Sequence, residues 1–324
     1  MKVGLFINTQ FPEGDNVAAR VPELVEQVRL ARQSGFASLL FPHHYLTDPL
    51  QMLQIAPLMA YLLPEAKGMT IGGNILLLPL LNPVHVAEEA ATLDVLSEGN
   101  FVLGAGLGYR EGEFDAFGIS LKERAARFTE SIQLMRALWA GGKITFRGRF
   151  YSVKDHGISL KPYRPGGPPV WVAGLVEAAV KRAARIGDAW VISNATTLGD
   201  TQPLMKIYRD TLASLGKTVT EYPIARECYV GASHATAMEE CRAALEYKYN
   251  SYAAWGMVSP TANMTFEDMA RDRFIIGDKV SVKEEIARWR EALGVNHFVM
   301  RVQWPGLAQE RVLGSIRRLG EMFA

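Results

Sequence analysis

Two adjacent histidines, His43 and His44, follow a short apolar run at residues 38–41 that is typical of a buried strand. An imidazole that titrates near neutrality can give a proton to a reacting centre or take one from it. Because neighbouring side chains on a strand point to opposite faces, we expect only one of the two rings to face a cavity. The alternative interpretation is a pair of capping or surface histidines. Both residues are therefore candidates for catalysis.

A second candidate is the glycine-rich run GAGLG at residues 104–108, which ends another apolar segment. The run is not a dinucleotide-binding fingerprint, because Tyr109 stands where the third glycine belongs. Glycines without side chains would let Gly106, Leu107 and Gly108 approach a flat ligand closely. The alternative is simple turn geometry. We interpret these three residues as candidate cofactor-binding positions.

A third candidate is the junction formed by Ala173, Gly174, Leu175 and Val176, where an apolar run passes directly into a helical pattern. The unpaired N–H groups at the start of a helix, and the helix dipole, favour a bound anion such as phosphate. The junction contains no lysine, so the backbone would carry most of the site. Arg124, on a preceding helical segment, could supply positive charge.

Several other classes of site and partner are disfavoured. The six histidines show no metal-ligand spacing, so we expect no metal site. The formal net charge is +1 without a basic stripe, which argues against nucleic acid and membrane partners. No apolar run approaches the roughly 20 residues of a spanning helix. Cys228 and Cys241 have no redox spacing and are interpreted as reduced structural thiols. We therefore expect a cytoplasmic location.

The elements that must position these residues alternate regularly along the chain. Four amphipathic helical patterns end at a glycine, namely Gly35, Gly99, Gly187 and Gly294, where a left-handed conformation is expected. Continuous apolar runs suit strands that are buried on both faces. The eight predicted strands are residues 3–7, 38–41, 71–78, 101–104, 170–173, 189–192, 224–230 and 297–302.

Eight strands alternating with helices over 324 residues predict an α/β protein of the (β/α)8 TIM-barrel class, in one domain spanning residues 1–324. A doubly wound open sheet is the structural alternative. Residues 143–153 predict a small hairpin insertion, because they alternate around Arg147-Gly148. Residues 247–276 are aromatic and rich in methionine, and they predict a lid or substrate wall at the C-terminal face of the strands. A surface excursion or an oligomer contact is the alternative for this segment.

With these motifs, the chain resembles the bacterial luciferase-like flavin-dependent monooxygenase family. The resemblance covers nearly the whole sequence. Asn100 departs from the arginine that the family usually carries at that turn. The segments that carry the resemblance are LP at 78–79, NPVHVAE at 82–88, LDVLSEGN at 93–100, GAG at 104–106, EFDAFG at 113–118, PVWVAG at 169–174 and AARIGDAW at 183–190.

The resemblance implies a barrel that binds reduced FMN, or alternatively the deazaflavin F420, at the C-terminal mouth. It places His43 near the reactive edge of the flavin, and it implies a non-prolyl cis peptide between Asn74 and Ile75 beneath the ring. It also implies that backbone amides at Gly174 and Leu175, together with Arg124, bind phosphate. Leu107 replaces an arginine found in luciferase itself, which weakens any inference of light emission.

Three hypotheses follow. The first is a monooxygenase that uses reduced FMN and O2 on a small apolar organic substrate, with the flavin reduced by a separate reductase because no nicotinamide fingerprint is present. The second is an F420-dependent hydride-transfer enzyme on the same scaffold. The third is a flavin-binding protein without catalysis, against which the polar residues at the strand ends argue. A homodimer formed through the helices after the second and third strands is an expectation from the family.

Overall fold

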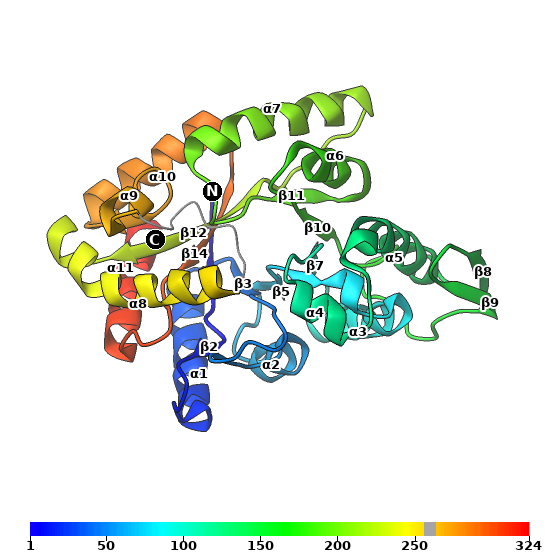
Figure 1. Cartoon of the computed structure of the whole chain (residues 1–324), viewed down its shortest axis with the longest axis horizontal. Helices are drawn as coiled ribbons and strands as arrows, with labels where there is room; N and C mark the ends of the chain where they lie inside the picture. The colour runs from blue at the N-terminus through cyan, green and yellow to red at the C-terminus, as the bar shows by residue number, and fades with distance from the viewer. Residues whose placement is uncertain (256–263, 324) are drawn as a thin grey trace.

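A computed structural model describes residues 1–255 and 264–323 of the chain. Strands and helices alternate along most of the chain, and the helices lie outside a curled sheet (Figure 1). All eight predicted strands are present, and seven of them have ends within two residues of the prediction. The prediction of one strand over residues 71–78 is wrong, because that run is divided into β5 and the short strand β6, Leu76–Leu77. The strands of the main path are β1 Lys2–Phe6, β3 Ser38–Phe41, β5 Thr70–Gly73, β7 Phe101–Gly106, β10 Val170–Ala173, β11 Ala189–Val191, β12 Pro223–Val230, β13 Ile275–Gly277 and β14 His297–Arg301.

These strands pair in the order β11-β10-β7-β5-β3-β1-β14-β12-β13, and every neighbouring pair is parallel. The short strand β6, Leu76–Leu77, also pairs with β7. Beyond the end of β11, Ile192 forms a parallel bridge with Ile224 of β12. The Ile192 N–H donates to Pro223 at 3.0 Å, and Ile192 accepts from the Ala225 N–H at 2.9 Å. Hydrogen bonding therefore also connects β11 with β12.

A layer of side chains from seven strands fills the interior of the curled sheet. At the same level β5 contributes Gly72, which is in register with Leu40 of β3 and Val102 of β7. A Cβ at Gly72 would lie 2.3 Å from the carbonyl oxygen of Val102, so only glycine fits there. The layer consists of Phe6, Leu40, Val102, Trp171, Ala189, Ala225 and Val299. Residues that alternate with this layer form the larger core between the sheet and the helices.

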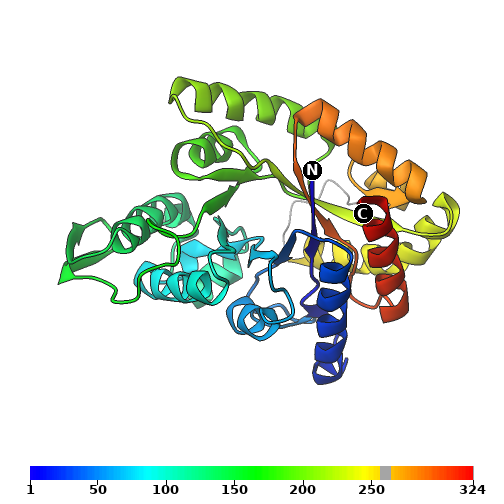
Figure 2. The same ribbon diagram turned by 180° about the vertical axis from the view of Figure 1, so that it is seen from behind.

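The helices cover the outside of the sheet, and α1 lies beside α11 in both ribbon views (Figures 1 and 2). Asn82 caps α3 by accepting a hydrogen bond from the Val84 N–H at 2.9 Å, with Pro83 as the first helical residue. The helices are α1 Val17–Gln33, α2 Ile55–Leu62, α3 Pro83–Leu96, α4 Glu111–Ala116, α5 Arg124–Trp139, α6 Glu177–Ile186, α7 Leu198–Ser214, α8 His234–Ala254, α9 Phe266–Ala270, α10 Lys279–Leu293 and α11 Gln309–Phe323, with 3-10 turns at Leu78–Leu80 and Leu121–Glu123.

The glycines after the helices follow the prediction at three positions. Gly35, Gly99 and Gly294 have φ of 78°, 81° and 65°. The prediction is wrong at Gly187, which is extended with φ −92° and ψ 164°. A Cβ there would lie 2.8 Å from the Ala183 carbonyl oxygen, so glycine is needed for a close approach rather than for handedness.

Two segments depart from the regular alternation. Strands β8 Ile144–Arg147 and β9 Ser152–His156 pair antiparallel and project from one end of the molecule (Figures 1 and 2). Glu130 of α5 holds the tip of this hairpin, because its carboxylate accepts three backbone N–H groups at residues 149–151. In the predicted lid segment, residues 247–254 continue α8, and residues 256–263 lie outside the described residues. A second short antiparallel pair joins β2 Gln10–Phe11 to β4 Gln51–Met52.

Candidate functional site

A cavity of about 1000 Å³ opens where the carboxyl ends of the parallel strands meet. This is the edge at which parallel α/β proteins bind ligands. The structure brings all of the sequence-predicted site residues together in the wall of this one cavity. These residues are His43, His44, Asn74, Ile75, Gly106, Leu107, Gly108, Arg124, Ala173, Gly174, Leu175 and Val176.

His43 is held as a neutral imidazole. Its Nδ1 accepts the Leu77 N–H at 3.2 Å, so the ring proton is on Nε2, which lies 3.2 Å from Oε1 of Gln54. The side chain is 4% exposed, and burial, together with His44, lowers the pKa of His43 to about 4. Because both ring nitrogens are engaged in a buried environment, the ring stays neutral near pH 7, and a role of His43 in catalysis stays a prediction.

His44 has a different environment and faces the same cavity. Both histidines line the cavity because β3 ends at Phe41, so the alternation of a strand no longer applies to them. Nδ1 of His44 lies 3.1 Å from Oε1 of Glu113, which also accepts the Tyr45 N–H at 2.8 Å. Burial opposes ionisation of Glu113, but the bonds from His44 and Tyr45 and the charge of Arg110 hold the pKa of this carboxyl below its ordinary value. The pair can therefore hold or move a proton at the cavity wall.

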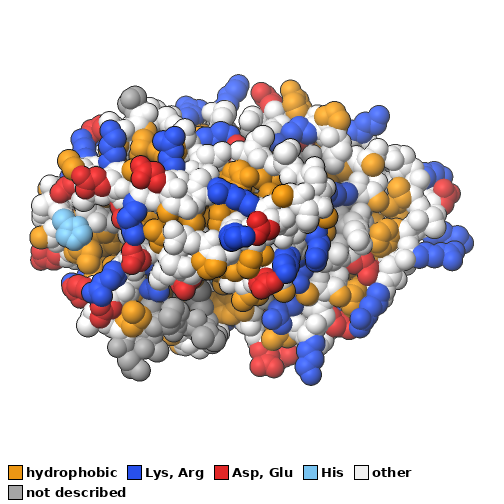
Figure 3. Space-filling model, turned by 90° about the horizontal axis from the view of Figure 1, so that it is seen from above, with side chains coloured by type: hydrophobic (Ala, Val, Ile, Leu, Met, Phe, Trp, Pro, Cys, Tyr) orange, Lys and Arg blue, Asp and Glu red, His pale blue; other side chains and the backbone are white. Residues whose placement is uncertain are grey.

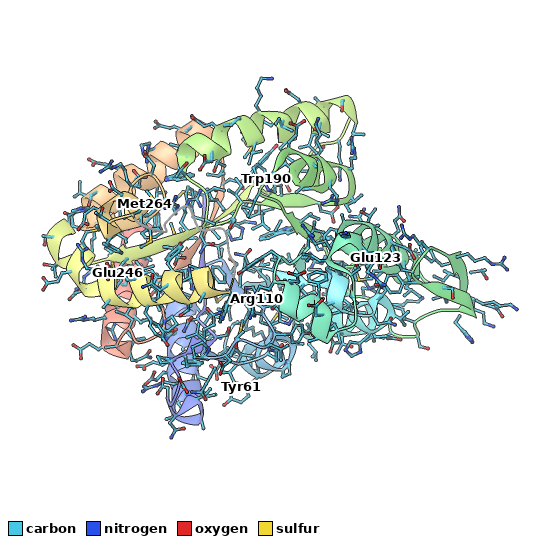
Figure 4. All side chains as sticks on the ribbon, in the orientation of Figure 1. Tyr61, Arg110, Glu123, Trp190, Glu246 and Met264 are labelled. Carbon is cyan, nitrogen blue, oxygen red and sulfur yellow. The ribbon has the colours of Figure 1, made fainter. Side chains whose placement is uncertain are left out.

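An aromatic wall surrounds His44. The rings of Tyr109, Tyr252 and Trp255 have centroids within 5.8–5.9 Å of the imidazole. Arg110 lies 4.5 Å over the Trp255 ring and is labelled in Figure 4, between α4 and the end of α8. Within residues 1–255 and 264–323, the Tyr109 hydroxyl has no hydrogen-bond partner, and burial raises the pKa of Tyr109. This phenol is a donor that a cavity occupant could engage.

The floor of the cavity is built by close backbone packing. The peptide bond between Asn74 and Ile75 is cis, as expected from the resemblance. A Cβ at Gly106 would lie 2.2 Å from Cδ1 of Ile75, and a Cβ at Gly104 would lie 1.8 Å from the Gly73 carbonyl oxygen. These two glycines are therefore needed for contact between strands of the protein itself. Gly108 has a φ of 76°, a left-handed conformation that favours glycine. At this position the alternative interpretation, a glycine required by the turn, is therefore correct.

The opposite end of the cavity is suited to an anion. Helix α6 begins after Val176, whose side chain provides no cap. The first N–H groups of a helix have no acceptor within the helix. At the junction before α6, a Cβ at Gly174 would lie 2.9 Å from Cβ of Ala179, so glycine allows a close approach there. Arg124 lines the same end, and burial together with Arg124 lowers the pKa of Arg182. Arg124 and an uncapped helix start thus lie at this end of the cavity, and Arg182 lines a second hollow.

Sequence reasoning missed the charged residues that support the cavity wall, and it did not predict that Tyr249 and Tyr252 belong to a helix. Glu113 lies one helical turn after Arg110 and faces inward from α4, a direction that sequence spacing alone did not reveal. Tyr249 and Tyr252 were interpreted as irregular lid residues, although their spacing of three places them on one face of α8. Glu227 and Lys248 are fully buried charges from β12 and α8, and no sequence signal predicted their pairing.

The described residues also bear on metal binding, membrane spanning and surface charge. Among the described residues, no group of three or more His, Cys, Asp or Glu side chains is arranged to hold a metal ion. No helix of the described residues is both long enough and apolar enough to cross a membrane. Figure 3 shows acidic and basic side chains interspersed on the face that it presents, in agreement with the near-zero net charge.

Comparison with known proteins gives relatives along most of the chain. An uncharacterized protein of Sinorhizobium fredii is 26% identical over 219 residues, which cover 65% of this chain and 61% of that protein. An F420-dependent glucose-6-phosphate dehydrogenase of Microbacterium testaceum is 29% identical over 311 residues, which cover 90% of each chain.

Solved structures with the same fold include two monooxygenases. A monooxygenase of Streptomyces bottropensis superposes with a TM-score of 0.86 at 22% identity, covering 99% of this chain and 98% of the other. The oxygenating constituent of 3,6-diketocamphane monooxygenase of Pseudomonas putida, in complex with FMN, superposes with a TM-score of 0.82 at 16% identity, covering 99% and 97%. A family model described as luciferase-like monooxygenase matches residues 1–297. The chain belongs to the luciferase-like monooxygenase family.

Proposed function

We propose that the protein is a flavin-dependent monooxygenase that uses reduced FMN and O2 to oxygenate a small, apolar organic substrate. The single observation that carries this proposal is one cavity that joins an uncapped helix start, a close-packed floor and a histidine paired with a carboxylate. A volume of about 1000 Å³ lies at the upper end of the usual range for ligand sites, which leaves room for a flavin and a small substrate.

The residues at hand fit the parts of a flavin mononucleotide. The N–H groups of Leu175 and Val176 and the guanidinium of Arg124 would hold the phosphate. The floor formed by Ile75 and Gly106 would support the ring, since it presents backbone and a single aliphatic side chain. These assignments follow from the chemistry of the groups that line each end of the cavity.

Reduced FMN would supply the electrons with which O2 is activated. His44, paired with Glu113, would exchange a proton with the bound molecules, and His43 would hold Leu77 and Gln54 in place as a neutral ring. The Tyr109 hydroxyl would donate a hydrogen bond into the cavity. Apolar and aromatic walls would exclude water, which strengthens each of these polar contacts.

We also propose how the barrel closes, that the protein forms a homodimer, and that a separate reductase reduces the flavin. We propose that the Ile192–Ile224 bridge closes the sheet into a (β/α)8 barrel. The homodimer stays a prediction, with Tyr61 of α2 and Leu96 of α3 as apolar side chains that are 59% and 55% exposed on the expected face (Figure 4 labels Tyr61). A separate reductase also stays a prediction, and it is expected because Tyr109 stands where the third glycine of a nicotinamide fingerprint belongs.

F420-dependent hydride transfer is the second candidate, and two observations favour it. Curated relatives include F420-dependent dehydrogenases at 29% identity. A hollow of about 630 Å³ runs along α6 and is lined by Lys181, Arg182 and Arg185, with Glu177 in the same wall. Such a basic hollow suits the acidic tail of F420, and the sequence alone did not indicate it.

Anaerobic titration with reduced FMN and with reduced F420, followed by admission of air, separates the two candidates. We expect reduced FMN to bind saturably. After air is admitted, the bound flavin should be oxidised more slowly than free flavin or through a spectrally distinct species. Saturable binding of F420 alone would establish the second candidate instead. Binding of FMN without any change in its reaction with air would indicate a flavin-binding protein without catalysis.

A further inference from the structure

A group of buried charges lies beside the cavity, at a distance along the sheet from the phosphate end. Glu227 of β12, Lys248 of α8 and Arg301 of β14 are each no more than 1% exposed. Arg301 lines the cavity, as do Tyr249 and its neighbour in space Asn194. Strand β14 is separated from β10, which leads to α6, by four strands in one direction along the sheet and by β12 and β11 in the other, across the Ile192–Ile224 bridge. The group is therefore distinct from the site proposed for phosphate.

Glu227 is hydrogen-bonded by Lys248 and by three neutral donors, and it makes no direct hydrogen bond to Arg301. Its Oε1 accepts from Lys248, Asn194 and the Tyr249 hydroxyl, and its Oε2 accepts from the indole N–H of Trp304. Three of these four donors share Oε1, and Oε2 accepts one. Its single negative charge is paired directly with Lys248.

Arg301 is held by neutral oxygens only. Its Nη2 donates to Oδ1 of Asn8 at 2.9 Å and to Oε1 of Gln10 at 3.0 Å, and its Nε donates to the Gln303 carbonyl at 3.4 Å. Within the described part of the chain, Nη1 of Arg301 has no hydrogen-bond acceptor. A guanidinium with five N–H donors thus has two left over at the cavity wall.

The balance of charge in this group is positive. Lys248 and Arg301 share one carboxylate, and the buried arginines Arg226 and Arg273 add to the same field. Burial, followed by the charge of Arg301, lowers the pKa of Lys248 to about 7 despite its contact with Glu227. Burial opposes the charge of Arg301, but Tyr252 and Glu227 hold the pKa of Arg301 above its ordinary value. The guanidinium is therefore charged, and its unpaired donors at the cavity wall can receive an anion.

We propose that Nη1 of Arg301 receives an anionic oxygen of the substrate, so that the enzyme acts on aromatic carboxylates or phenolates. The aromatic part of this assignment follows from the rings of Tyr249 and Tyr252 in the same wall. Tyr252 also links the two halves of the site, since its hydroxyl donates to Gln10 and its ring lies 5.9 Å from that of His44. The inference rests on the proposed function for the reaction, and it narrows the substrate from an apolar molecule to an acid.

The test compares benzoate with benzamide, which have nearly the same shape and differ in charge. Titrations of the protein by calorimetry, with and without bound cofactor, give both dissociation constants. We expect benzoate to bind at least about tenfold more tightly, because a charge-assisted hydrogen bond replaces a neutral one. In Arg301→Gln the ratio of the benzamide dissociation constant to the benzoate dissociation constant should fall to about one. In Arg301→Lys, which keeps the positive charge, this ratio should lie between those of the wild type and Arg301→Gln. Equal affinities in the wild type, or no binding of either probe, would overturn the inference without any variant.

A matched control identifies which anion is bound. Arg124→Gln removes positive charge at the other end of the cavity and should leave the preference for benzoate intact. Loss of the preference in Arg124→Gln but not in Arg301→Gln would place benzoate at the phosphate end and overturn the inference. If Arg301→Gln lowers the affinity for reduced FMN at least tenfold and leaves the benzoate preference unchanged, Arg301 binds the cofactor. This result would also overturn the inference. Failure of the protein to bind either flavin would refute the proposed function alone, because the benzoate comparison is also made on the cofactor-free protein.

Discussion

The neutral state of His43 has a measurable consequence for stability. Its pKa is about 4 in the folded chain and 6.5 as an ordinary histidine. Because the folded pKa is lowered, the contribution to stability is fully present above pH 6.5 and is lost as the pH falls toward 4. At about 1.4 kcal/mol per pKa unit, the whole effect is about 3 kcal/mol, and about 2 kcal/mol of it is lost by pH 5.

The perturbation that isolates this term is His43→Gln, which cannot titrate and can still accept from the Leu77 N–H. Urea unfolding at pH 7.5 and pH 5.0, followed by tryptophan fluorescence, gives the free energy of unfolding of both proteins. We expect the wild type to lose about 2 kcal/mol more than His43→Gln between the two values of pH. Equal losses in the two proteins, or an NMR titration of His43 with a midpoint between pH 6 and 7, would refute the reasoning.

Three further predictions concern the site and its support. Glu113→Gln removes the charge paired with His44, and we expect turnover to fall about tenfold with little change in cofactor affinity; an unchanged rate would argue against a role for the pair. Gly174→Ala forces contact with Ala179 at 2.9 Å and should weaken FMN about tenfold, whereas Gly112→Ala, with no atom within 4 Å, should not. Glu130→Ala leaves three N–H groups at the hairpin tip without their acceptor, and the free energy of unfolding should fall by about 2 kcal/mol in urea titrations.

The strands could be predicted from the sequence because they are buried on both faces. Each one is a continuous apolar run, and the glycine after a helix marks where the next run begins. The break in the third run could not be derived from apolar content, since Asn74-Ile75 interrupts a segment that reads as one strand. The conformation of Gly187 could not be predicted either. The sequence does not distinguish a glycine that is needed for close packing from one that is needed for a left-handed turn.

The candidate site was predictable in position but not in chemistry. Residues at the ends of parallel strands converge, so the wall could be listed before the structure was known. Protonation depends instead on partners distant in the chain, as with Leu77 for His43 and Glu113 for His44. The pairing of Glu227 with Lys248 also depends on tertiary packing, because a helix and a strand 21 residues apart bring the charges together.

The central claim is that this cavity holds a flavin by its phosphate at the start of α6. The most direct measurement compares the dissociation constants of reduced FMN and reduced riboflavin, which lacks the phosphate, in the wild type and in Arg124→Gln. We predict that the wild type binds FMN at least about tenfold more tightly than riboflavin, and that Arg124→Gln loses most of this preference while riboflavin affinity stays the same. Equal affinity of the wild type for the two flavins, or a preference that Arg124→Gln leaves intact, would contradict the claim.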